Sequence, residues 1–143
     1  TENIASIVGF GHAATLAAEA LGDGEPHRLV ELRDRFERQL GELLPGRVHL
    51  NGHPTQRLPN TANLRIDGAP ALSLLAAMRA VAVSAGSACH AGRDEPSPVL
   101  TAMGLSTEDA LCALRISVGR WSTADEIDEA CTVIAAVVPD VSF

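Results

Sequence analysis

Two kinds of hydrophobic periodicity alternate along this chain, and the alternation limits it to a mixed α/β fold. Residues 26–44 carry large apolar side chains at three- and four-residue spacing, with acidic residues four positions before arginines on the opposite face. This pattern predicts an amphipathic helix that Pro45-Gly46 ends. Val48 and Leu50, and then residues 62–66, instead alternate apolar with polar side chains, which predicts two short strands.

The same reasoning predicts the remaining elements. Apolar residues at near-helical spacing predict a helix over residues 4–21, stopped by Gly22-Asp23-Gly24. Four further helices are expected: over residues 70–79, from Ser97 to Gly104, from Ser106 onward, and after the capping box Thr123-x-x-Glu126. Two further strands are expected, over residues 81–83 and 114–118. The last strand places Arg115 on the face opposite its apolar residues. We therefore expect one α/β domain, with a small sheet and helices packed mainly on one face.

The basic residues exclude one kind of chemistry. All 11 Lys+Arg residues are arginines, so the chain has no lysine and supplies no side-chain amine for a Schiff base. The 18 acidic residues give a formal net charge of −7, and the arginines form no basic stripe, so nucleic acid is not an expected partner. A length of 143 residues is typical of one domain.

The apolar residues and the cysteines suggest the cellular setting. No uninterrupted apolar run approaches the ~20 residues that a membrane span needs, and the opening Thr-Glu-Asn-Ile is unlike a signal peptide. We therefore expect a cytoplasmic protein without a membrane partner. Three cysteines leave at least one unpaired, and a chain of this length needs no disulfide framework, so free thiols are expected.

The three cysteines differ in their surroundings. Cys131 lies on the apolar stripe of the last predicted helix, which indicates a buried, inert thiol, and Cys112 receives the same interpretation. Cys89 lies among Gly, Ala and Ser residues and precedes His90 and Arg93, whose positive charge would favour a thiolate. From these residues alone, Cys89 is equally a nucleophile or an ordinary loop cysteine.

Two further candidate sites come from the residues. His49-x-x-x-His53 has a spacing seen in zinc sites, and Cys89 with its neighbour could add ligands. The two histidines do not share one helix face, however, and no second cysteine lies two to four residues from Cys89, so no metal is expected. Arg115 could hold an anion through its guanidinium, with a surface ion pair as the alternative.

Several segments resemble the carboxy-terminal part of the cysteine desulfurases. The opening Thr1-Glu2-Asn3-Ile4-Ala5 and the segment Pro59-Asn60-Thr61-Ala62-Asn63 are similar to stretches of that family. The strongest resemblance is in Ala82-Val83-Ser84-Ala85-Gly86-Ser87-Ala88-Cys89-His90-Ala91-Gly92, Glu95-Pro96-Ser97-Pro98-Val99-Leu100 and Leu114-Arg115-Ile116-Ser117-Val118-Gly119-Arg120. The match covers nearly the whole chain in order, and it favours Cys89 as a nucleophile.

The resemblance implies an architecture. Members of the family are homodimeric pyridoxal 5'-phosphate enzymes of the aspartate-aminotransferase fold, with a large cofactor domain and a small domain. Residues 26–143 would be the small α+β domain with a mostly antiparallel sheet, and residues 1–25 a helical segment at the interdomain or dimer interface. The lysine that holds the cofactor would belong to the large domain, so we expect a piece of a longer protein that is inactive by itself.

The resemblance also implies roles for three residues. Cys89 would attack the sulfur of L-cysteine and carry it as a persulfide, leaving L-alanine, before passing it to an iron–sulfur scaffold or another acceptor. Arg115 would bind the substrate carboxylate, and Thr1 would reach the cofactor phosphate of the opposite subunit. A fixed guanidinium on a strand and a small-residue loop suit these tasks.

The same residues are compatible with three further functions. His90 follows the cysteine where many desulfurases have threonine, and the surrounding segments also resemble selenocysteine lyases, so the chain could be a selenocysteine lyase domain. The spacing from Cys89 to Pro96 is closer to the iron–sulfur-supplying desulfurases. A persulfide carrier or partner-binding module without pyridoxal phosphate would also use Cys89, and a structural zinc module would use the histidines.

Overall fold

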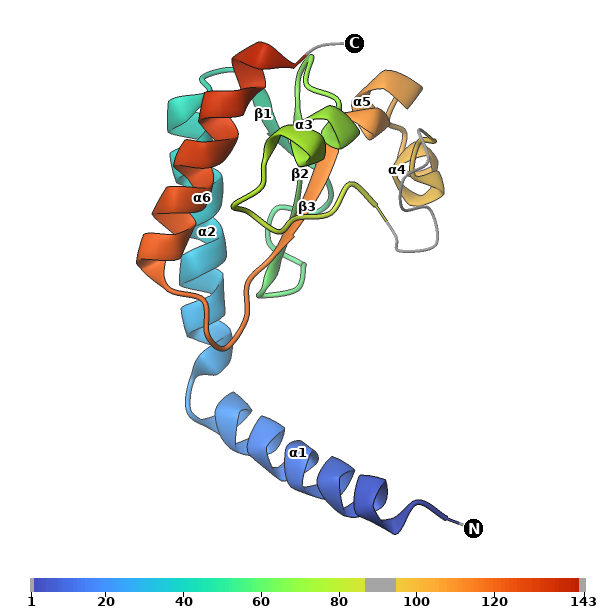
Figure 1. Ribbon diagram of the computed structural model, residues 1–143, viewed down its shortest axis with the longest axis vertical. Helices are drawn as coiled ribbons and strands as arrows, with labels where there is room; N and C mark the ends of the chain where they lie inside the picture. Colours follow the sequence, from blue (N-terminus) through green and yellow to red (C-terminus); the bar gives the residue numbers. More distant parts are fainter. Residues whose placement is uncertain (1, 87–94, 142–143) are drawn as a thin grey trace.

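The computed structural model describes residues 2–86 and 95–141 (Figure 1). Its elements, in chain order, are α1 (Ile4–Gly22), α2 (Glu25–Leu43), β1 (Val48–Leu50), β2 (Thr61–Ile66), α3 (Ala71–Ala77), α4 (Pro98–Ala102), α5 (Thr107–Leu111), β3 (Ala113–Ser117), α6 (Ala124–Val137) and the 3-10 turn η2 (Val138–Asp140). The mixed α/β class expected from the sequence is confirmed.

The three strands form one antiparallel sheet in the order β1-β2-β3. Along the central strand β2, burial alternates as the sequence predicts: Ala62, Leu64 and Ile66 are buried, whereas the residues between them are partly exposed. One face of the sheet is therefore apolar and covered, and the other, which we call the outer face, is polar.

The apolar face packs against α2 and α6, which run side by side (Figure 1). The buried side chains of these helices lie on the predicted stripes, at Leu32, Phe36 and Leu40 of α2 and Ile127, Cys131 and Ile134 of α6. On the outside, Arg35 of α2 donates two hydrogen bonds of 2.6 Å to the carboxylate of Asp128 on α6. The arrangement confirms the expectation of helices mainly on one face.

The predicted helix ends are also present. Thr123 and Glu126 form the reciprocal capping box that opens α6. The Ser106 side chain accepts a hydrogen bond from the backbone N–H of Asp109 and so caps α5. Gly104 follows α4 with φ +95°, a conformation that strongly favours glycine. The helix expected over 70–79 is shorter, since α3 ends at Ala77.

The prediction of a strand over residues 81–83 was wrong. Among the described residues, the chain meets the free edge of β3 only at Ser84, which forms an isolated antiparallel bridge with Arg115. Before Ser84 the chain diverges from β3, and a cavity of about 410 Å³ separates residues 80–83 from the end of β3 and the start of α6. The short Val-Ala-Val run therefore lines this cavity, and its backbone does not extend the sheet.

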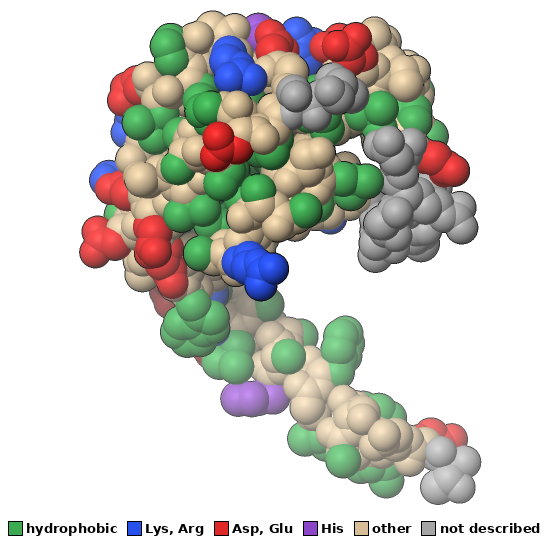
Figure 2. All heavy atoms as spheres, turned by 45° about the horizontal axis from the view of Figure 1, so that its top comes forward, with side chains coloured by type: hydrophobic (Ala, Val, Ile, Leu, Met, Phe, Trp, Pro, Cys, Tyr) green, Lys and Arg blue, Asp and Glu red, His purple; other side chains and the backbone are tan. Residues whose placement is uncertain are grey.

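Helix α1 projects away from the rest of the chain, as Figures 1 and 2 show. None of its residues is buried, and Ile4 and Phe10 are 71% and 78% exposed. Within the described residues, α1 is the one helix long and apolar enough to cross a membrane. A search for uninterrupted apolar runs misses it because small and weakly polar residues are interspersed. One such helix near the beginning of the chain is weak evidence for a membrane.

Candidate functional site

A row of four polar residues crosses the outer face of the sheet. Asn63 of β2 lies directly opposite Arg115 of β3, and Arg115 lies opposite Ser84. On the other side of Asn63, the register of β1 with β2 places Asn51 opposite it, just beyond the end of β1. Residues opposite one another in antiparallel strands share a face, so this row of Asn51, Asn63, Arg115 and Ser84 is one continuous polar strip.

The backbone of Arg115 is fixed by Ser84. The Arg115 N–H donates to the Ser84 carbonyl at 2.7 Å, and the Ser84 N–H donates to the Arg115 carbonyl at 3.1 Å. The guanidinium is exposed, and its Nη2 lies 3.4 Å from Ser84 Oγ. Ser84 Oγ in turn donates to the Gly86 carbonyl at 2.7 Å, which closes a tight turn at the last described residue before Ser87.

Arg115 has no carboxylate partner among the described residues. Five arginines form ion pairs in this part of the chain, whereas Arg115 shares its lack of a carboxylate partner with four others: paired are Arg28, Arg33, Arg35, Arg57 and Arg65, and unpaired are Arg38, Arg47, Arg79 and Arg120. A guanidinium held on a strand without a counter-charge is suited to bind an anion, and its planar donors match a carboxylate. The surface ion pair that the sequence left open for Arg115 is therefore absent from the described part of the structure.

The two asparagines of the row are hydrogen-bonded to each other. Asn51 Nδ2 donates to Asn63 Oδ1 at 2.7 Å, and the Asn51 backbone N–H donates to the Asn63 carbonyl at 2.8 Å. The Asn63 side chain is therefore fixed on the side facing β1.

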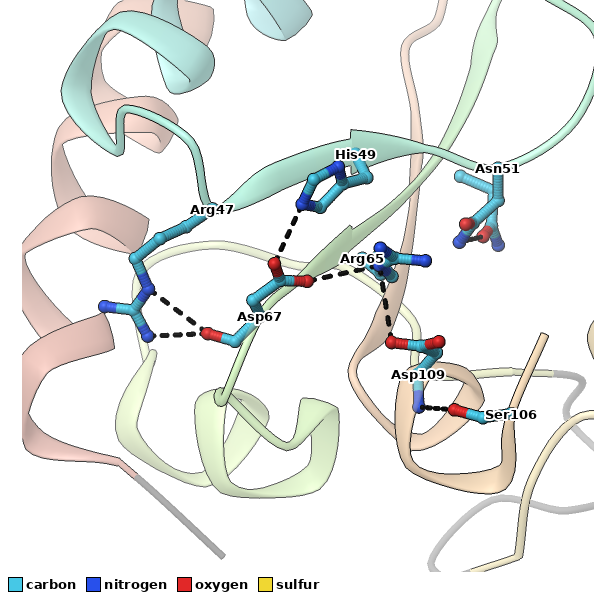
Figure 3. A network of polar contacts seen from close by, with 8 residues as sticks. Arg47, His49, Asn51, Arg65, Asp67, Ser106 and Asp109 are labelled. Carbon is cyan, nitrogen blue, oxygen red and sulfur yellow. Dashed lines mark hydrogen bonds and ion pairs between the residues drawn. The ribbon is translucent and has the colours of Figure 1, made fainter.

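A second polar cluster lies on the same face, next to the row (Figure 3). The Asp67 carboxylate contacts His49 Nε2 at 2.8 Å and Arg65 Nε at 3.2 Å, and Arg65 lies 3.5 Å from Asp109 of α5. Partial desolvation acts to raise the pKa of Asp67, but the hydrogen bonds from His49 and Arg65 outweigh it and lower that pKa. Arg47 donates to the Asp67 backbone carbonyl at 2.7 Å. Arg65 of β2 therefore lies beside both carboxylates, and its contact with Asp109 joins α5 to β2.

The histidines of the possible metal site are separately engaged. His49 contacts Asp67, whereas His53 Nδ1 accepts the backbone N–H groups of Thr55 and Gln56 at 3.1 and 2.9 Å. The described residues contain no group of three or more side chains that could hold a metal ion.

Two of the three cysteines lie within the described residues. Cys112 and Cys131 are both buried, as the sequence predicts. Burial raises the pKa of both thiols, that of Cys131 to about 12. Both are therefore protonated at neutral pH. Cys89 and Thr1, to which the family resemblance gives roles, lie outside the described residues.

Comparison with known proteins places this geometry in a family. Residues 1–130 match the family model described as Aminotransferase class-V. The chain belongs to the class-V aminotransferase family. Among curated relatives, it is 46% identical over 138 residues to a cysteine desulfurase of Frankia sp. (strain EuIK1), covering 96% of this chain and 33% of the relative. It is 40% identical over 140 residues to the cysteine desulfurase IscS of Methanosarcina thermophila, covering 96% and 34%.

Solved structures of NifS-like proteins share this fold. A NifS-like protein superposes with a TM-score of 0.81 at 25% identity, covering 99% of this chain and 35% of the other. A NifS-like protein from Rickettsia africae ESF-5 gives a TM-score of 0.77 at 27% identity, covering 99% and 36%. This class-V aminotransferase chain thus spans about a third of the length of the relatives it matches.

Sequence reasoning identified one member of the polar row of this class-V aminotransferase and missed the others. Arg115 was found because strand alternation sets it opposite its apolar neighbours. Asn63 carries the same signal, since it alternates with buried Ala62 and Leu64. Asn51 and Ser84 join the row only through the strand register, which no local pattern fixes.

Proposed function

We propose that this chain is the small, sulfur-handling domain of a pyridoxal-phosphate-dependent cysteine desulfurase. In this proposal L-cysteine is the substrate, Cys89 receives its sulfur, and Arg115 binds its carboxylate. The observation that carries the proposal is the bridge between Ser84 and Arg115. It holds Ser84, which precedes Cys89 by five residues in the sequence, beside Arg115, whose guanidinium has no carboxylate partner among the described residues.

The sulfur transfer is balanced without an added oxidant. The Cys89 thiolate attacks the substrate sulfur, a sulfur–sulfur bond forms, and the bond between that sulfur and Cβ breaks. The electron pair of the broken bond stays with Cβ, which then takes up a proton, so L-cysteine and a thiol become L-alanine and a persulfide. Arg115 would hold the carboxylate while the sulfur is attacked, a task that a guanidinium on a fixed strand performs well.

The other two thiols support the choice of Cys89 as the nucleophile. Cys112 and Cys131 are buried and their pKa values are raised, so neither supplies a thiolate at neutral pH. Cys89 remains as the thiol whose flanking small residues and following His90 favour reactivity.

The residues of this chain do not fit the anchoring of pyridoxal phosphate. Covalent attachment needs a lysine, and the sequence has none. The cofactor would therefore be anchored by another part of a longer protein, with Thr1 reaching its phosphate from the opposite subunit of a homodimer. Residues 1–25 would lie at the interface with that part. The unburied apolar surface of α1 supports this arrangement.

We further propose that the persulfide passes to an iron–sulfur scaffold or a comparable acceptor in the cytoplasm. The spacing of seven residues from Cys89 to Pro96 supports this choice over a selenocysteine lyase.

The decisive experiment uses the longest reading frame that contains this sequence. The purified protein is incubated with L-cysteine, and its peptides are examined by mass spectrometry for one added sulfur atom. We expect the sulfur on Cys89, alanine as product, and loss of both in Cys89→Ser with an unchanged cofactor absorption spectrum. Retained desulfuration in Cys89→Ser would refute the assigned role.

Two measurements separate a desulfurase from a selenocysteine lyase and from a persulfide carrier. Faster turnover of L-selenocysteine than of L-cysteine, without persulfide on Cys89, would identify a selenocysteine lyase. Sulfur uptake by the 143-residue chain from a separate desulfurase, with no activity in the longest reading frame, would identify a persulfide carrier.

A further inference from the structure

Asn63 lies at the centre of the polar row, between Asn51 and Arg115. Its Oδ1 accepts from Asn51 Nδ2 at 2.7 Å, and its backbone carbonyl accepts from the Asn51 N–H at 2.8 Å. The acceptor end of the Asn63 side chain is therefore already used, on the side of the sheet where β1 lies.

The donor end of the same side chain is not used by Asn51. A carboxamide carries its acceptor oxygen and its donor nitrogen on different bonds of one carbon, so holding Oδ1 toward Asn51 leaves Nδ2 directed elsewhere, free to donate on the side of Arg115. The residue on that other side is Arg115, directly opposite Asn63 in the register of β2 with β3.

The pairing geometry brings these two side chains close. Arg115 uses its backbone N–H and carbonyl toward Ser84, so its pair with Asn63 is of the non-hydrogen-bonded kind. Opposed side chains approach most closely in such pairs, where the Cα atoms are about 4.5 Å apart.

Both side chains have unused donors among the described residues. Asn63 Nδ2 has no hydrogen-bond partner there, and neither do Nε and Nη1 of Arg115, whose Nη2 lies beside Ser84 Oγ. A carboxylate has two oxygens on one side and can accept from the Arg115 guanidinium and from Asn63 Nδ2 together. If Asn63 instead presented its oxygen toward Arg115, that oxygen would repel the carboxylate.

We propose that Asn63 is a second ligand of the substrate carboxylate, and that Asn51 positions it by fixing the orientation of its carboxamide. The inference rests on the proposed function, because it concerns the carboxylate that Arg115 would bind. It adds a neutral donor from the central strand to the cationic donor from β3, and so makes carboxylate recognition a property of two strands.

The first test uses the 143-residue chain and needs no cofactor. Sodium acetate is titrated while the side-chain N–H signals of Asn63 and Arg115 are followed by ¹H–¹⁵N NMR. Both signals should shift and give one dissociation constant. In Asn63→Ala the constant from the Arg115 signal should rise about three- to ten-fold, because a hydrogen bond to a charged group is lost at an exposed site. A shift of Arg115 alone, or an unchanged constant in Asn63→Ala, would overturn the proposal.

Two further arms test orientation and ligand class. In Asn51→Asp the new carboxylate can only accept hydrogen bonds, so Asn63 should turn its Nδ2 toward it and its Oδ1 toward Arg115. This variant should weaken acetate binding as much as Asn63→Ala does. Equal acetate binding in Asn51→Asp would contradict the positioning role. Inorganic phosphate that binds more tightly than acetate would overturn the assignment to a substrate carboxylate.

Kinetics on the longest reading frame separate this inference from the proposed function. Asn63→Ala should raise KM for L-cysteine about three- to ten-fold with little change in kcat, whereas Ser73→Ala on α3 should leave both unchanged. If Arg115→Gln leaves KM unchanged, the proposed function loses its carboxylate site. If Arg115→Gln raises KM and Asn63→Ala does not, the inference about Asn63 alone is wrong.

Discussion

The Cys131 thiol should be almost inert to alkylation while the chain is folded. Its residue is 0% exposed between α6 and α2, and its Sγ lies 3.6 Å from the Phe36 carbonyl. Burial, followed by the negative charge of Asp128, raises the pKa of Cys131 to about 12. At pH 8 a thiol of pKa about 12 is ionised to about one part in 10⁴, against about a quarter for an ordinary thiol of pKa about 8.5. The reactive fraction is therefore about 10³-fold lower, before steric access is considered.

The assay compares the folded and unfolded chain. Iodoacetamide is added at pH 8, samples are quenched over time, and the three cysteine peptides are quantified by mass spectrometry. In the folded chain we expect Cys89 to react at least as fast as an ordinary thiol and Cys131 at least 10³-fold more slowly than Cys89. In concentrated guanidinium chloride the three rates should converge, which controls for local sequence effects.

One result would refute this reasoning about burial. If Cys131 reacts within ten-fold of its unfolded rate while near-ultraviolet circular dichroism reports intact packing, its thiol is neither shielded nor raised in pKa. Slow labelling that accelerates in sub-denaturing urea would instead show that reaction requires opening of the helix pair, as the burial predicts.

Two further predictions concern the core and the outer face. Leu40→Ala should lower the free energy of unfolding by about 2–5 kcal/mol, because Leu40 is 1% exposed. Leu43→Ala on the same helix, at a site that is 45% exposed, should lower it much less. Urea unfolding measures both losses, and equal losses would contradict the buried position of Leu40. The pKa of Asp67 is lower in the folded chain than in the unfolded chain, where it is about 3.9. The contacts of its carboxylate therefore stabilise the fold fully at pH values above about 3.9, and this stabilisation is lost as the pH falls through the lower pKa of the folded chain. Carboxyl NMR should show that low midpoint, and His49→Ala should move it upward; an unmoved midpoint would exclude the His49 contact.

The sequence predicts most of this fold because its strongest signals are local. The stripe containing Phe36 and Leu40, the alternation along β2 and the Thr123 capping box each act within a few residues, and the structure confirms each. Contacts between distant segments had no such signal. Arg28, for example, donates to the backbone carbonyls of Gly119, Arg120 and Ser122, more than ninety positions away, and so ties the start of α2 to the turn before α6.

The error over residues 81–83 has the same origin. A short apolar run is compatible with a strand, with a helix segment or with chain that lines a cavity, and its periodicity does not distinguish them. What decides is whether a neighbouring strand lies within hydrogen-bonding distance along its length, and β3 does so only at Ser84. The polar row was missed for a related reason, since strand register determines which residues lie opposite Arg115.

Helix α1 offers the last test, because nothing within the described residues buries it. It has no acidic residue in its first turn and no basic residue in its last, and Gly9 and Gly11 lower its intrinsic stability. An unsupported helix of 19 residues is marginally stable in water. In the 143-residue chain at low concentration, amide hydrogen exchange in α1 should therefore approach the unfolded rate, while α2 and α6 remain protected. In the longest reading frame, α1 should become protected if the proposed interface covers it. Protection of α1 in the isolated chain that disappears on dilution would instead show self-association through its apolar side chains, and protection independent of concentration would contradict the exposed position of the helix.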